Sequence, residues 1–406
     1  MRLGHVVRKY LGQPRLVLPK IADVPGYTQP RPAEDDTIVV SMSSGVDSSV
    51  TAALYAQRYK NVHGIFMANW TSENDKSCTE GDWREVQHLC KQIGIPCSRV
   101  SFEHEYWADV FIPMIDMYRA GLTPNPDVGC NKYVKFGKMV EHLHDSFGDQ
   151  GKNWWLATGH YARMMQHDES GQLHLMRGTQ TEKDQSHYLS TIPHNAMSRL
   201  LFPLGHFSKP QVRQMASQMG LISSSKPDSQ GLCFVSHTGN NFRDFLDSYI
   251  PENPGDIITE DGLVVGKHKG LWHATIGQKS GVSMPQGDPK TKGVWFVSEK
   301  RPETNELVIV RGGNNPSLFK NGLVVQDWYW LSPDLGTSLP PLDELTVQFR
   351  SLQSPIPLLS LFAKDSELKF LLARPYKGIA PGQTLVLYHG ERVLGSGVIT
   401  STFDED

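Results

Sequence analysis

The sequence predicts an α/β fold, a doubly wound parallel sheet, followed by one or two small antiparallel β units. In the first half of the chain, short apolar runs alternate with stretches of helical periodicity, a pattern typical of parallel sheets. Beyond about Phe242, Gly, Pro and Asp separate short runs such as "LWHATIG", "GVWFVS" and "TLVLYHG", a spacing typical of antiparallel β structure. The 406 residues suffice for two or three domains.

The individual elements of the parallel part follow from local patterns. The run "TIVVSM" at residues 37–42 is apolar and β-branched, as expected of a buried parallel strand. Apolar residues at helical spacing follow this strand, and they recur between Val86 and Ile93. The runs "HGIFMAN", "CSRVSF" and "WWLATGHY" predict three further strands. The region "PGYTQPRP" ahead of them is typical of a linker.

Composition and charge narrow the class of protein. Hydrophobic and charged contents of 39% and 20% are those of an ordinary globular protein, and no apolar run approaches the roughly 20 residues that span a bilayer. We therefore expect no membrane partner. A net charge of −3 excludes a globally basic nucleic-acid binder, so any RNA contacts must be local. Five scattered cysteines argue against a disulfide framework and favour a reducing compartment.

The first 22 residues contain five basic side chains and no acidic one. This composition suits an organellar transit segment, and a frayed basic N-terminus is the alternative.

The stretch "SMSSGVDSS" at residues 41–49 lies between the first strand and its helix, where open α/β sheets bind ligands. Backbone N–H groups and a helix N-terminus form an anion cradle there, and Asp47 is predicted to cap the helix or to hold magnesium. The loop has no lysine such as that of GxxxxGK[ST]. It therefore favours holding pyrophosphate as a leaving group during attack at the α-phosphate. A serine-rich helix cap without a ligand is the alternative.

This loop resembles the SGGVDSS pyrophosphatase loop of the ATP-dependent tRNA 2-thiouridylases, with Ser44 in place of the first of the paired glycines. We expect the remaining Gly45 to take the strained backbone conformation. The resemblance continues in order from about residue 37 to 399, through "TPNPDVGCNKYVKFG", "ATGHYAR", "LFPLGHFSKPQVR", "KPDSQGLCFV" and "APGQTLVLY". The variants "SSGVDSS" and "SQGLCF" are most similar to mitochondrial, fungal-type members, which implies the mitochondrial matrix, with the cytoplasm as the alternative.

The resemblance implies a division of the chain. It consists of an N-terminal extension (1–34), a pyrophosphatase-loop catalytic domain similar to the adenine nucleotide α hydrolases (35–238), a small central β domain (239–315) and a C-terminal β-barrel that binds tRNA (316–406). The implied ATP-binding residues are Ser41, Met42, Ser43, Ser44, Gly45, Val46, Asp47, Ser48, Met67 and Gly159. From the sequence alone, a core position for Met67 is equally well supported.

The five cysteines have different surroundings. Cys90 lies on an apolar helix face and is expected to pack in the core, while Cys78 and Cys97 carry no local signal. Cys130 and Cys233 lie in glycine-flanked, loop-like contexts with a cation nearby. Such surroundings favour a thiolate with a lowered pKa.

The resemblance assigns roles to these two cysteines. It implies that Cys233 carries a persulfide, that Cys130 is its catalytic partner, and that Asp127 is a general acid or base at the uracil ring. A structural zinc site is disfavoured because no CxxC occurs. An iron–sulfur cluster held by Cys130, Cys233 and Asp127 stays open as the alternative.

The RNA contacts are likewise implied by the resemblance. They comprise Asn125, Pro126 and Asp127 at the flipped-out base, His160, and Lys183, Asp184, Gln185, Arg350, Ser351 and Gln383 elsewhere on the tRNA. Family members commonly carry an aromatic residue where Ser351 stands, so Arg350 must contribute more of the grip. A buried structural role for His160 and a solvated surface for the others are the alternatives.

Together these patterns predict an ATP-dependent tRNA-uridine 2-sulfurtransferase. ATP with Mg²⁺ would adenylate the C2 oxygen of the wobble uridine, and persulfide sulfur would replace it. The expected partners are the anticodon arm of tRNA and a persulfide donor or relay protein supplied by a cysteine desulfurase. Another adenylating ligase with this loop, or an inactive tRNA-binding protein, are the rival interpretations.

Overall fold

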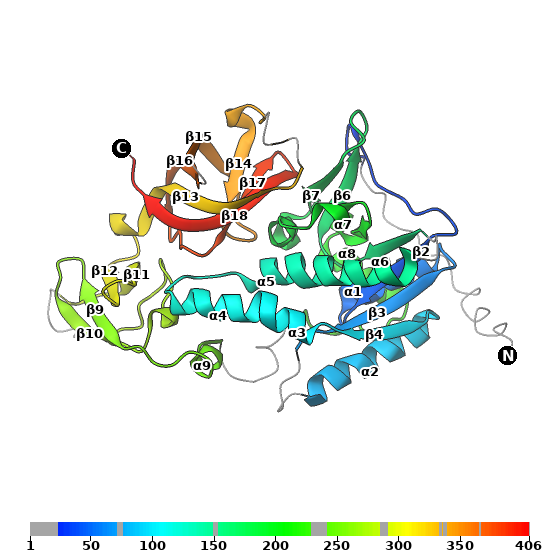
Figure 1. The fold of residues 1–406 in the computed structure, drawn as a ribbon, viewed down its shortest axis with the longest axis horizontal. Coiled ribbons are helices and arrows are strands. Elements are labelled where there is room, and N and C mark those ends of the chain that lie inside the picture. Colours follow the sequence, from blue (N-terminus) through cyan, green and yellow to red (C-terminus); the bar gives the residue numbers. More distant parts are fainter. Residues whose placement is uncertain are drawn as a thin grey trace. The chain divides into compact units, whose positions relative to one another are not determined.

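The computed structural model describes residues 23–70, 76–148, 153–228, 242–284, 291–332, 335, 339–364 and 367–405 (Figure 1). The chain forms two compact units. The first contains the described parts of Met1–Trp107, Cys130–Thr238 and Glu391–Val393, and the second contains those of Ala108–Gly129, Gly239–Gly390 and Leu394–Asp406.

The first unit is built on a parallel sheet with the strand order β4-β3-β2-β5-β8. These strands are β2 (Thr37–Met42), β3 (Val62–Ala68), β4 (Cys97–Ser101), β5 (Trp154–Ala157) and β8 (Leu200–Leu201). Every neighbouring pair is parallel, which confirms the predicted doubly wound sheet. The chain moves outward from β2 through β3 to β4 and then returns to the other side of β2. The order therefore reverses between β2 and β5, where such sheets bind ligands.

Helices cover this sheet and bury its apolar strands. The helical segments of the unit are α1 (Val46–Ala56), α2 (Lys76–Ile93), α3 (Glu103–Tyr106), η2 (Cys130–Lys138), α6 (Met139–Phe147), η4 (Thr181–Lys183), η5 (Ser186–Leu189), α7 (His194–Met197), η6 (Pro203–His206) and α8 (Lys209–Gln218). Figure 1 shows α2 running beside β4. The core includes Ile38, Val50, Leu89 and Cys90, so the core position predicted for Cys90 is confirmed.

An antiparallel hairpin interrupts the parallel part. The strands β6 (Ala162–His167) and β7 (Leu173–Arg177) pair with each other, and the short β1 (Tyr27–Thr28) extends the hairpin at β6. Ser170 and Gly171 lie in the turn, and Gly171 has a φ of 68°, a conformation that favours glycine. The sequence patterns did not predict this hairpin.

The second unit begins within η1 (Trp107–Phe111) and includes α4 (Ile112–Arg119), α5 (Pro126–Gly129) and α9 (Phe242–Asp247). Its smaller sheet has the order β10-β9-β12-β11. The elements are β9 (Gly255–Thr259), β10 (Val264–His268), η7 (Leu271–His273), β11 (Trp295–Arg301) and β12 (Glu306–Arg311). The central pair β9 and β12 is parallel, whereas the other pairs are antiparallel as expected.

The expected β run "LWHATIG" is wrong. Leu271 and Trp272 lie in the helical turn η7, and both side chains are buried. Adjacent residues of a strand point to opposite faces, so a strand with one covered face would have exposed one of the two.

A closed antiparallel barrel forms the rest of the second unit. Its elements are η8 (Pro316–Leu318), β13 (Phe319–Trp330), η10 (Leu342–Glu344), β14 (Leu345–Gln348), β15 (Ile356–Lys364), β16 (Glu367–Lys377), β17 (Thr384–His389) and β18 (Arg392–Phe403). The strand order β18-β13-β16-β15-β14-β17 closes through a pairing of β17 with β18. Leu323, Phe370 and Leu387 belong to its apolar interior. This confirms the predicted C-terminal barrel.

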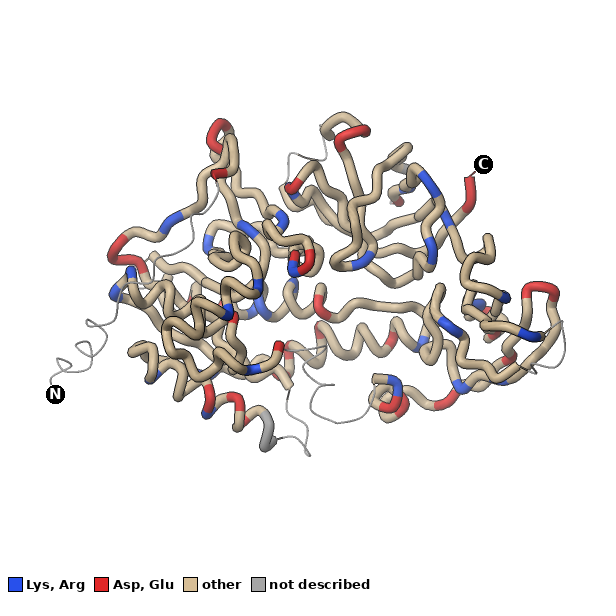
Figure 2. The backbone as a smooth tube through the Cα atoms, turned by 180° about the vertical axis from the view of Figure 1, so that it is seen from behind, with Lys and Arg blue, Asp and Glu red and all other residues tan. Residues whose placement is uncertain are grey.

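Charged residues of both signs are scattered along the tube in Figure 2. Any strong electrostatic site must therefore come from side chains that the fold brings together. Among the described residues, no helix is long and apolar enough to cross a membrane.

Candidate active site at the loop after β2

The loop between β2 and α1 lies at the point where the strand order reverses. Gly45 is the N-cap residue of α1, with φ −83° and ψ 164°, an extended conformation open to any residue. The expectation that Gly45 takes a strained conformation is therefore wrong. Ser44 has no positive φ, so it stands in place of a glycine without backbone strain. Its hydroxyl donates to Asp82 at 2.5 Å, and Lys226 donates to it at 2.6 Å.

Several predicted ATP-binding residues have side chains turned into the protein. Met42 and Val46 belong to the hydrophobic core, so only their backbone faces the loop. The Ser48 hydroxyl donates to the Ser43 carbonyl at 2.9 Å and accepts from the Ser43 N–H at 3.0 Å. Ser48 thus closes the loop into a tight turn. Ser41 and Met67 are half-buried near the ends of β2 and β3, and their contact with nucleotide stays a prediction.

Asp47 lies in the first turn of α1 and makes side-chain contacts only away from the helix backbone. The Lys209 amine donates to both carboxylate oxygens at 2.8 Å, and the Tyr161 hydroxyl donates to Oδ1 at 2.8 Å. Burial and the Asp47 charge raise the pKa of Tyr161. The N-cap of α1 is Gly45, which has no side chain to cap the helix, and Asp47 already lies inside the helix, so the predicted capping role of Asp47 is wrong. Its carboxylate lies beside the loop, and its role as a metal ligand stays a prediction.

Gly159 packs directly against the start of α1. A Cβ atom at this position would lie 2.9 Å from the carbonyl carbon and Cβ of Asp47 and 3.0 Å from the Ser48 nitrogen. Those distances are shorter than van der Waals contact, so only glycine fits here without a shift of the backbone. Gly159 therefore allows β5 and β2 to place their following loops side by side. Direct contact of Gly159 with ATP stays a prediction.

The fold adds cations that the loop motif lacks. Lys209 begins α8, 162 residues after Asp47, and Lys226 lies 182 residues after Ser44. Lys226 also pairs with Glu85 at 2.6 Å. Both lysines occur in sequence blocks that carry the family resemblance, but no spacing in the sequence connects them with the loop. They are the main functional candidates that the sequence did not predict.

Asp228 joins three cations next to this loop. Its carboxylate accepts from Lys183 at 2.9 Å, lies 3.1 Å from the Lys209 amine, and pairs with Arg213. Although burial alone would raise it, the hydrogen bonds from Lys183 and Lys209 lower the pKa of Asp228. Lys209, with 12% of its side chain exposed, thus bridges Asp47 and Asp228.

His160 follows Gly159 in an aromatic environment. Its Nδ1 lies 2.7 Å from the Thr158 hydroxyl, and its ring contacts Phe136 and Phe202. Burial, together with the Lys135 charge, lowers the pKa of His160 to about 3. His160 is therefore neutral at physiological pH, and a charged contact with RNA phosphate is not available to it.

The predicted "KDQ" segment divides into one surface cation and two residues that hold the loop. Asp184 is 6% exposed, and its carboxylate accepts from the backbone of Gly178 and Ser186 at 2.9 and 3.0 Å. The Gln185 side-chain oxygen accepts from the Tyr161 N–H at 3.0 Å. Lys183 is half-buried, with 42% of its side chain exposed, and pairs with Asp228. Contacts of these residues with tRNA stay predictions.

Cys130 begins the π-helical segment η2 in the first unit and is 3% exposed. Its predicted loop-like context is therefore wrong, because the polypeptide is already helical at Pro126. Single π-helical turns occur frequently at functional sites. Cys233 lies outside the described residues, as does the side chain of Cys78, so the pairing of Cys130 with Cys233 stays a prediction.

In the second unit, the "NPD" segment forms the start of α5. The Asn125 side-chain oxygen accepts from the Asp127 N–H at 3.1 Å and so caps this helical turn. Pro126 is buried, whereas Asp127 is partly exposed. Gln383 donates through its side-chain amide to the carbonyl of Thr123, two residues before Asn125. The structure thus brings together two predicted tRNA-binding segments that are far apart in the sequence.

Arg350 and Ser351 lie at the turn after β14. Arg350 is exposed, yet its guanidinium donates to the Gly378 carbonyl and, at 3.5 Å, to the Lys377 carbonyl. Partial burial at these carbonyls lowers the pKa of Arg350. Ser351 is half-buried before Leu352, which has a φ of 62°.

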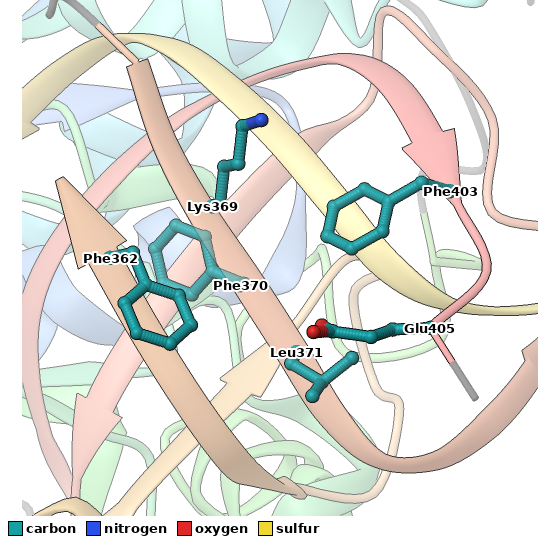
Figure 3. A pocket seen from close by; sticks show the side chains of 6 residues that line it. All are labelled: Phe362, Lys369, Phe370, Leu371, Phe403 and Glu405. Atoms are coloured by element: carbon teal, nitrogen blue, oxygen red, sulfur yellow. The ribbon is translucent and has the colours of Figure 1, made fainter. Parts of the chain in front are cut away.

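A separate cavity of about 370 Å³ opens on the barrel, lined by Phe362, Lys369, Phe370, Leu371, Phe403 and Glu405 (Figure 3). Lys369 and the predicted tRNA-binding turn lie near opposite ends of β16, since Arg350 contacts Lys377. The cavity contains none of the predicted site residues.

Within the described residues, no group of three or more His, Cys, Asp or Glu side chains is arranged to hold a metal ion. Asp47 nevertheless suits magnesium, which commonly binds one or two carboxylates together with substrate phosphates.

The parallel sheet with a loop at its strand reversal defines a doubly wound α/β protein, a class that binds ligands at this edge of the sheet. Comparison with known proteins is more specific. A tRNA methyl transferase HUP domain matches residues 36–237, a tRNA methyl transferase PRC-barrel domain matches residues 243–311, and an aminomethyltransferase beta-barrel domain matches residues 320–399.

Curated relatives identify the family. The mitochondrial tRNA-specific 2-thiouridylase 1 of Saccharomyces cerevisiae is 45% identical over 94% of this chain and 96% of its own length. The tRNA-specific 2-thiouridylase MnmA of Staphylococcus aureus is 39% identical over 92% of this chain and 97% of its own length. The chain belongs to the tRNA-specific 2-thiouridylase family. An NMN synthetase from Francisella tularensis matches at 17% identity and a TM-score of 0.32, over 54% of this chain and 77% of that chain, which is too distant to bear on function.

Proposed function

We propose that this chain is an ATP-dependent tRNA-uridine 2-sulfurtransferase that converts the wobble uridine of tRNA to 2-thiouridine. The observation that carries the proposal is the loop after β2, whose carboxylate Asp47 lies beside Lys209 at the strand reversal. The same activity is named in relatives that match nearly the whole chain.

The loop would hold the pyrophosphate portion of ATP. Backbone N–H groups at the start of α1 would donate to its oxygens, and the helix dipole favours negative charge there. Lys209 and Lys226 would neutralise the leaving pyrophosphate. Attack of the uracil C2 oxygen on the α-phosphate breaks the bond to the β-phosphate, so pyrophosphate leaves and the oxygen becomes adenylated.

Asp47 would hold magnesium together with the phosphate oxygens. The ion supplies charge neutralisation for the departing pyrophosphate. Before Asp47 can bind magnesium, the Lys209 amine must move away from the Asp47 carboxylate. The phosphates would give that amine another anionic partner.

Sulfur transfer would use the two cysteines singled out in the sequence. The terminal sulfur of a Cys233 persulfide attacks C2, and AMP leaves with the former oxygen. The Cys130 thiolate then attacks the inner sulfur of Cys233, which releases 2-thiouridine and forms a Cys130–Cys233 disulfide. Alternatively, Cys130 attacks first and releases hydrosulfide, which attacks C2. Either route ends in a disulfide that a thiol reductant must reopen with two electrons. Asp127 would move a proton at the uracil ring.

The remaining parts of the chain would provide recognition. Residues 35–238 would carry catalysis and residues 316–406 would bind tRNA, with residues 239–315 between them. Asn125, Gln383 and Arg350 would contact the anticodon arm, and a persulfide donor or relay protein would load Cys233. The name of the yeast relative supports a mitochondrial location.

The test is reconstitution with defined components. Purified chain, wobble-uridine tRNA, ATP, Mg²⁺ and a persulfide donor are combined under iron-free anaerobic conditions, and nucleosides are analysed by mass spectrometry. We expect 2-thiouridine, AMP and pyrophosphate in equal amounts. Pyrophosphate release without any need for tRNA would favour another ligase instead. If thiolation occurs only after iron and sulfide are added, the enzyme uses an iron–sulfur cluster and the persulfide mechanism is wrong.

A further inference from the structure

Eight charged side chains surround the loop in the described part of the first unit. The cations are Lys183, Lys209, Arg213 and Lys226, and the carboxylates are Asp47, Asp82, Glu85 and Asp228. Their formal charges cancel. A polyphosphate that approached this arrangement unchanged would therefore meet no net attraction, although the loop backbone is shaped for an anion.

Asp228 occupies the centre of the cationic half. Its two carboxylate oxygens engage three cations, namely Lys183 at 2.9 Å, Lys209 at 3.1 Å, and Arg213. The cations come from two elements, since Lys183 ends η4, Lys209 begins α8, and Arg213 lies one turn further along α8. Three cations converge on this one carboxylate, while Lys209 also pairs with Asp47 and Arg213 also donates to the carbonyls of Ser224 and Lys226. The three cations suit a ligand with more oxygens and more charge, such as a pyrophosphate group.

The position of Lys209 connects these cations to the loop. One amine lies 2.8 Å from both oxygens of Asp47 and 3.1 Å from Asp228. The ammonium group of Lys209 therefore contacts both Asp228 in the three-cation site and Asp47 in the first turn of α1. An anion that replaced Asp228 would also be next to the loop N–H groups.

We infer that Lys183, Lys209 and Arg213 form a pyrophosphate-binding site, and that Asp228 is an internal occupant which the phosphate groups must displace. Asp228 thereby keeps the cations ordered and prevents their mutual repulsion before the nucleotide arrives. It also makes the site selective, because a ligand must carry enough charge to compete with a carboxylate. The inference rests on the proposed function only for the choice of pyrophosphate as the ligand.

If Asp228 competes with the ligand, removal of its charge should strengthen phosphate binding. A carboxylate that only holds these cations in position should weaken metal-free phosphate binding when it is neutralised, because the cations lose their order. A carboxylate that competes with the ligand should strengthen it. Asp228→Asn keeps the shape of the side chain and removes its charge, so the variant distinguishes the two cases.

The experiment is calorimetric titration of the full chain with sodium pyrophosphate in the presence of EDTA. We expect Asp228→Asn to bind metal-free pyrophosphate about tenfold more tightly than the unmodified protein, since several partly exposed ion pairs no longer compete. Lys209→Met should bind it about tenfold more weakly because it lacks the shared amine. Glu141→Gln and Lys138→Met are the controls, because they make the same charge changes in an exposed ion pair at the start of α6. Both controls should bind metal-free pyrophosphate as the unmodified protein does.

Thermal unfolding provides a second measurement if Asp228→Asn is poorly folded. Three cations without their carboxylate repel one another, so this variant should melt at a lower temperature and be stabilised more by pyrophosphate than the unmodified protein. If Asp228→Asn yields no folded protein, Arg213→Gln replaces it and should weaken metal-free binding several-fold. Equal or weaker binding by Asp228→Asn overturns the inference, as does unchanged binding by Arg213→Gln.

These measurements need neither tRNA nor a sulfur donor. If the proposed activity were wrong but the loop still bound pyrophosphate, the variants would keep their expected order. If thiolation were observed and Asp228→Asn bound pyrophosphate no better, only the inference about Asp228 would fail.

Discussion

The loop after β2 and the barrel turn at Arg350 hold their functional side chains in different ways. Around the loop, charged side chains contact one another, as Lys209 contacts Asp47. At the barrel turn, Arg350 donates to the backbone carbonyls of Gly378 and Lys377. Both regions contain predicted binding residues, but only the first consists of mutually neutralising charges.

This difference decides how each region can meet a substrate. An ion pair between two side chains can exchange one partner for a charged ligand and leave no buried group without a partner. A side chain bound to a backbone carbonyl cannot move without leaving that carbonyl unsatisfied, which is costly. We therefore expect rearrangement at the loop and preformed recognition at the barrel turn, where the guanidinium has further N–H groups for a phosphate.

The largest effect should come from a change that spares both regions. Cys130→Ser removes the proposed partner thiol, so 2-thiouridine formation should fall by more than about a thousandfold. ATP binding and tRNA binding should stay unchanged, and tRNA-dependent pyrophosphate release should continue. Labelled sulfur followed from the donor onto protein and then tRNA measures each stage. A variant that still completes thiolation would exclude Cys130 from the chemistry.

The next largest effect concerns the charge exchange at the loop. Asp47→Ala removes the carboxylate proposed for magnesium and leaves Lys209 with Asp228 alone, so pyrophosphate release should fall by about a hundredfold or more. Binding of tRNA, measured by filter retention, should stay within about twofold because no RNA contact is lost. Glu141→Gln is the control for removal of a carboxylate. Near-normal pyrophosphate release by Asp47→Ala would contradict the assignment of the loop.

A third prediction concerns the close packing that holds the loop. Gly159→Ala places a methyl group 2.9 Å from Asp47 atoms, so α1 must shift. We expect a loss of about 1–3 kcal/mol in unfolding free energy and roughly tenfold weaker ATP binding. Gly81→Ala is the control, because a Cβ there meets nothing within 4 Å. ATP titration and denaturant unfolding measure both effects, and equal behaviour of the two variants would refute the packing argument.

The sequence predicted the regular part of the fold because its signals are local. Alternating apolar strands and helices define a parallel sheet, and the loop after the first strand must then lie at its carboxyl edge. The helical position of Cys130 could have been predicted from the sequence, since Asn before Pro is a common arrangement at a helix N-terminus and occurs here at Asn125 and Pro126. The β6–β7 hairpin was not predicted, although the turn residues "DESG" separate its two apolar runs.

Other features depend on contacts that no local pattern contains. Lys209 reaches the loop because α8 packs on α1, and Lys226 reaches Ser44 from the turns that follow α8. The segment Ala108–Gly129 belongs to the second unit, although residues on both sides of it belong to the first. The conformation of Gly45 differs from the expectation because Ser48 closes the turn without a positive φ.

A fourth prediction tests the neutral state of His160. Its pKa in the folded protein is about 3, below the unfolded value of 6.5. Stability from the neutral ring is complete above pH 6.5 and is lost as the pH falls from 6.5 toward 3, by up to about 1.4 kcal/mol per pH unit. His160→Phe should therefore show a shallower loss of unfolding free energy over this range. His88→Gln, at an exposed site, should follow the unmodified protein. If the unfolding free energies of His160→Phe and of the unmodified protein fall in parallel with pH, His160 is charged in the folded protein.

The smallest effect is expected from substitutions at Arg350, which distinguish the contribution of its charge from that of its shape. Arg350→Ala should weaken tRNA binding a few-fold and lower the slope of log affinity against log salt by about one unit, as expected for one phosphate contact. Arg350→Lys should restore the slope but not the full affinity, because one amine cannot hold the Gly378 carbonyl and a phosphate with the same fork. Lys60→Ala, an exposed cation paired with Glu34 in the first unit, is the control. If Arg350→Ala weakens binding without a change in slope, Arg350 shapes the turn and contacts no phosphate, and the barrel turn then recognises tRNA without charge.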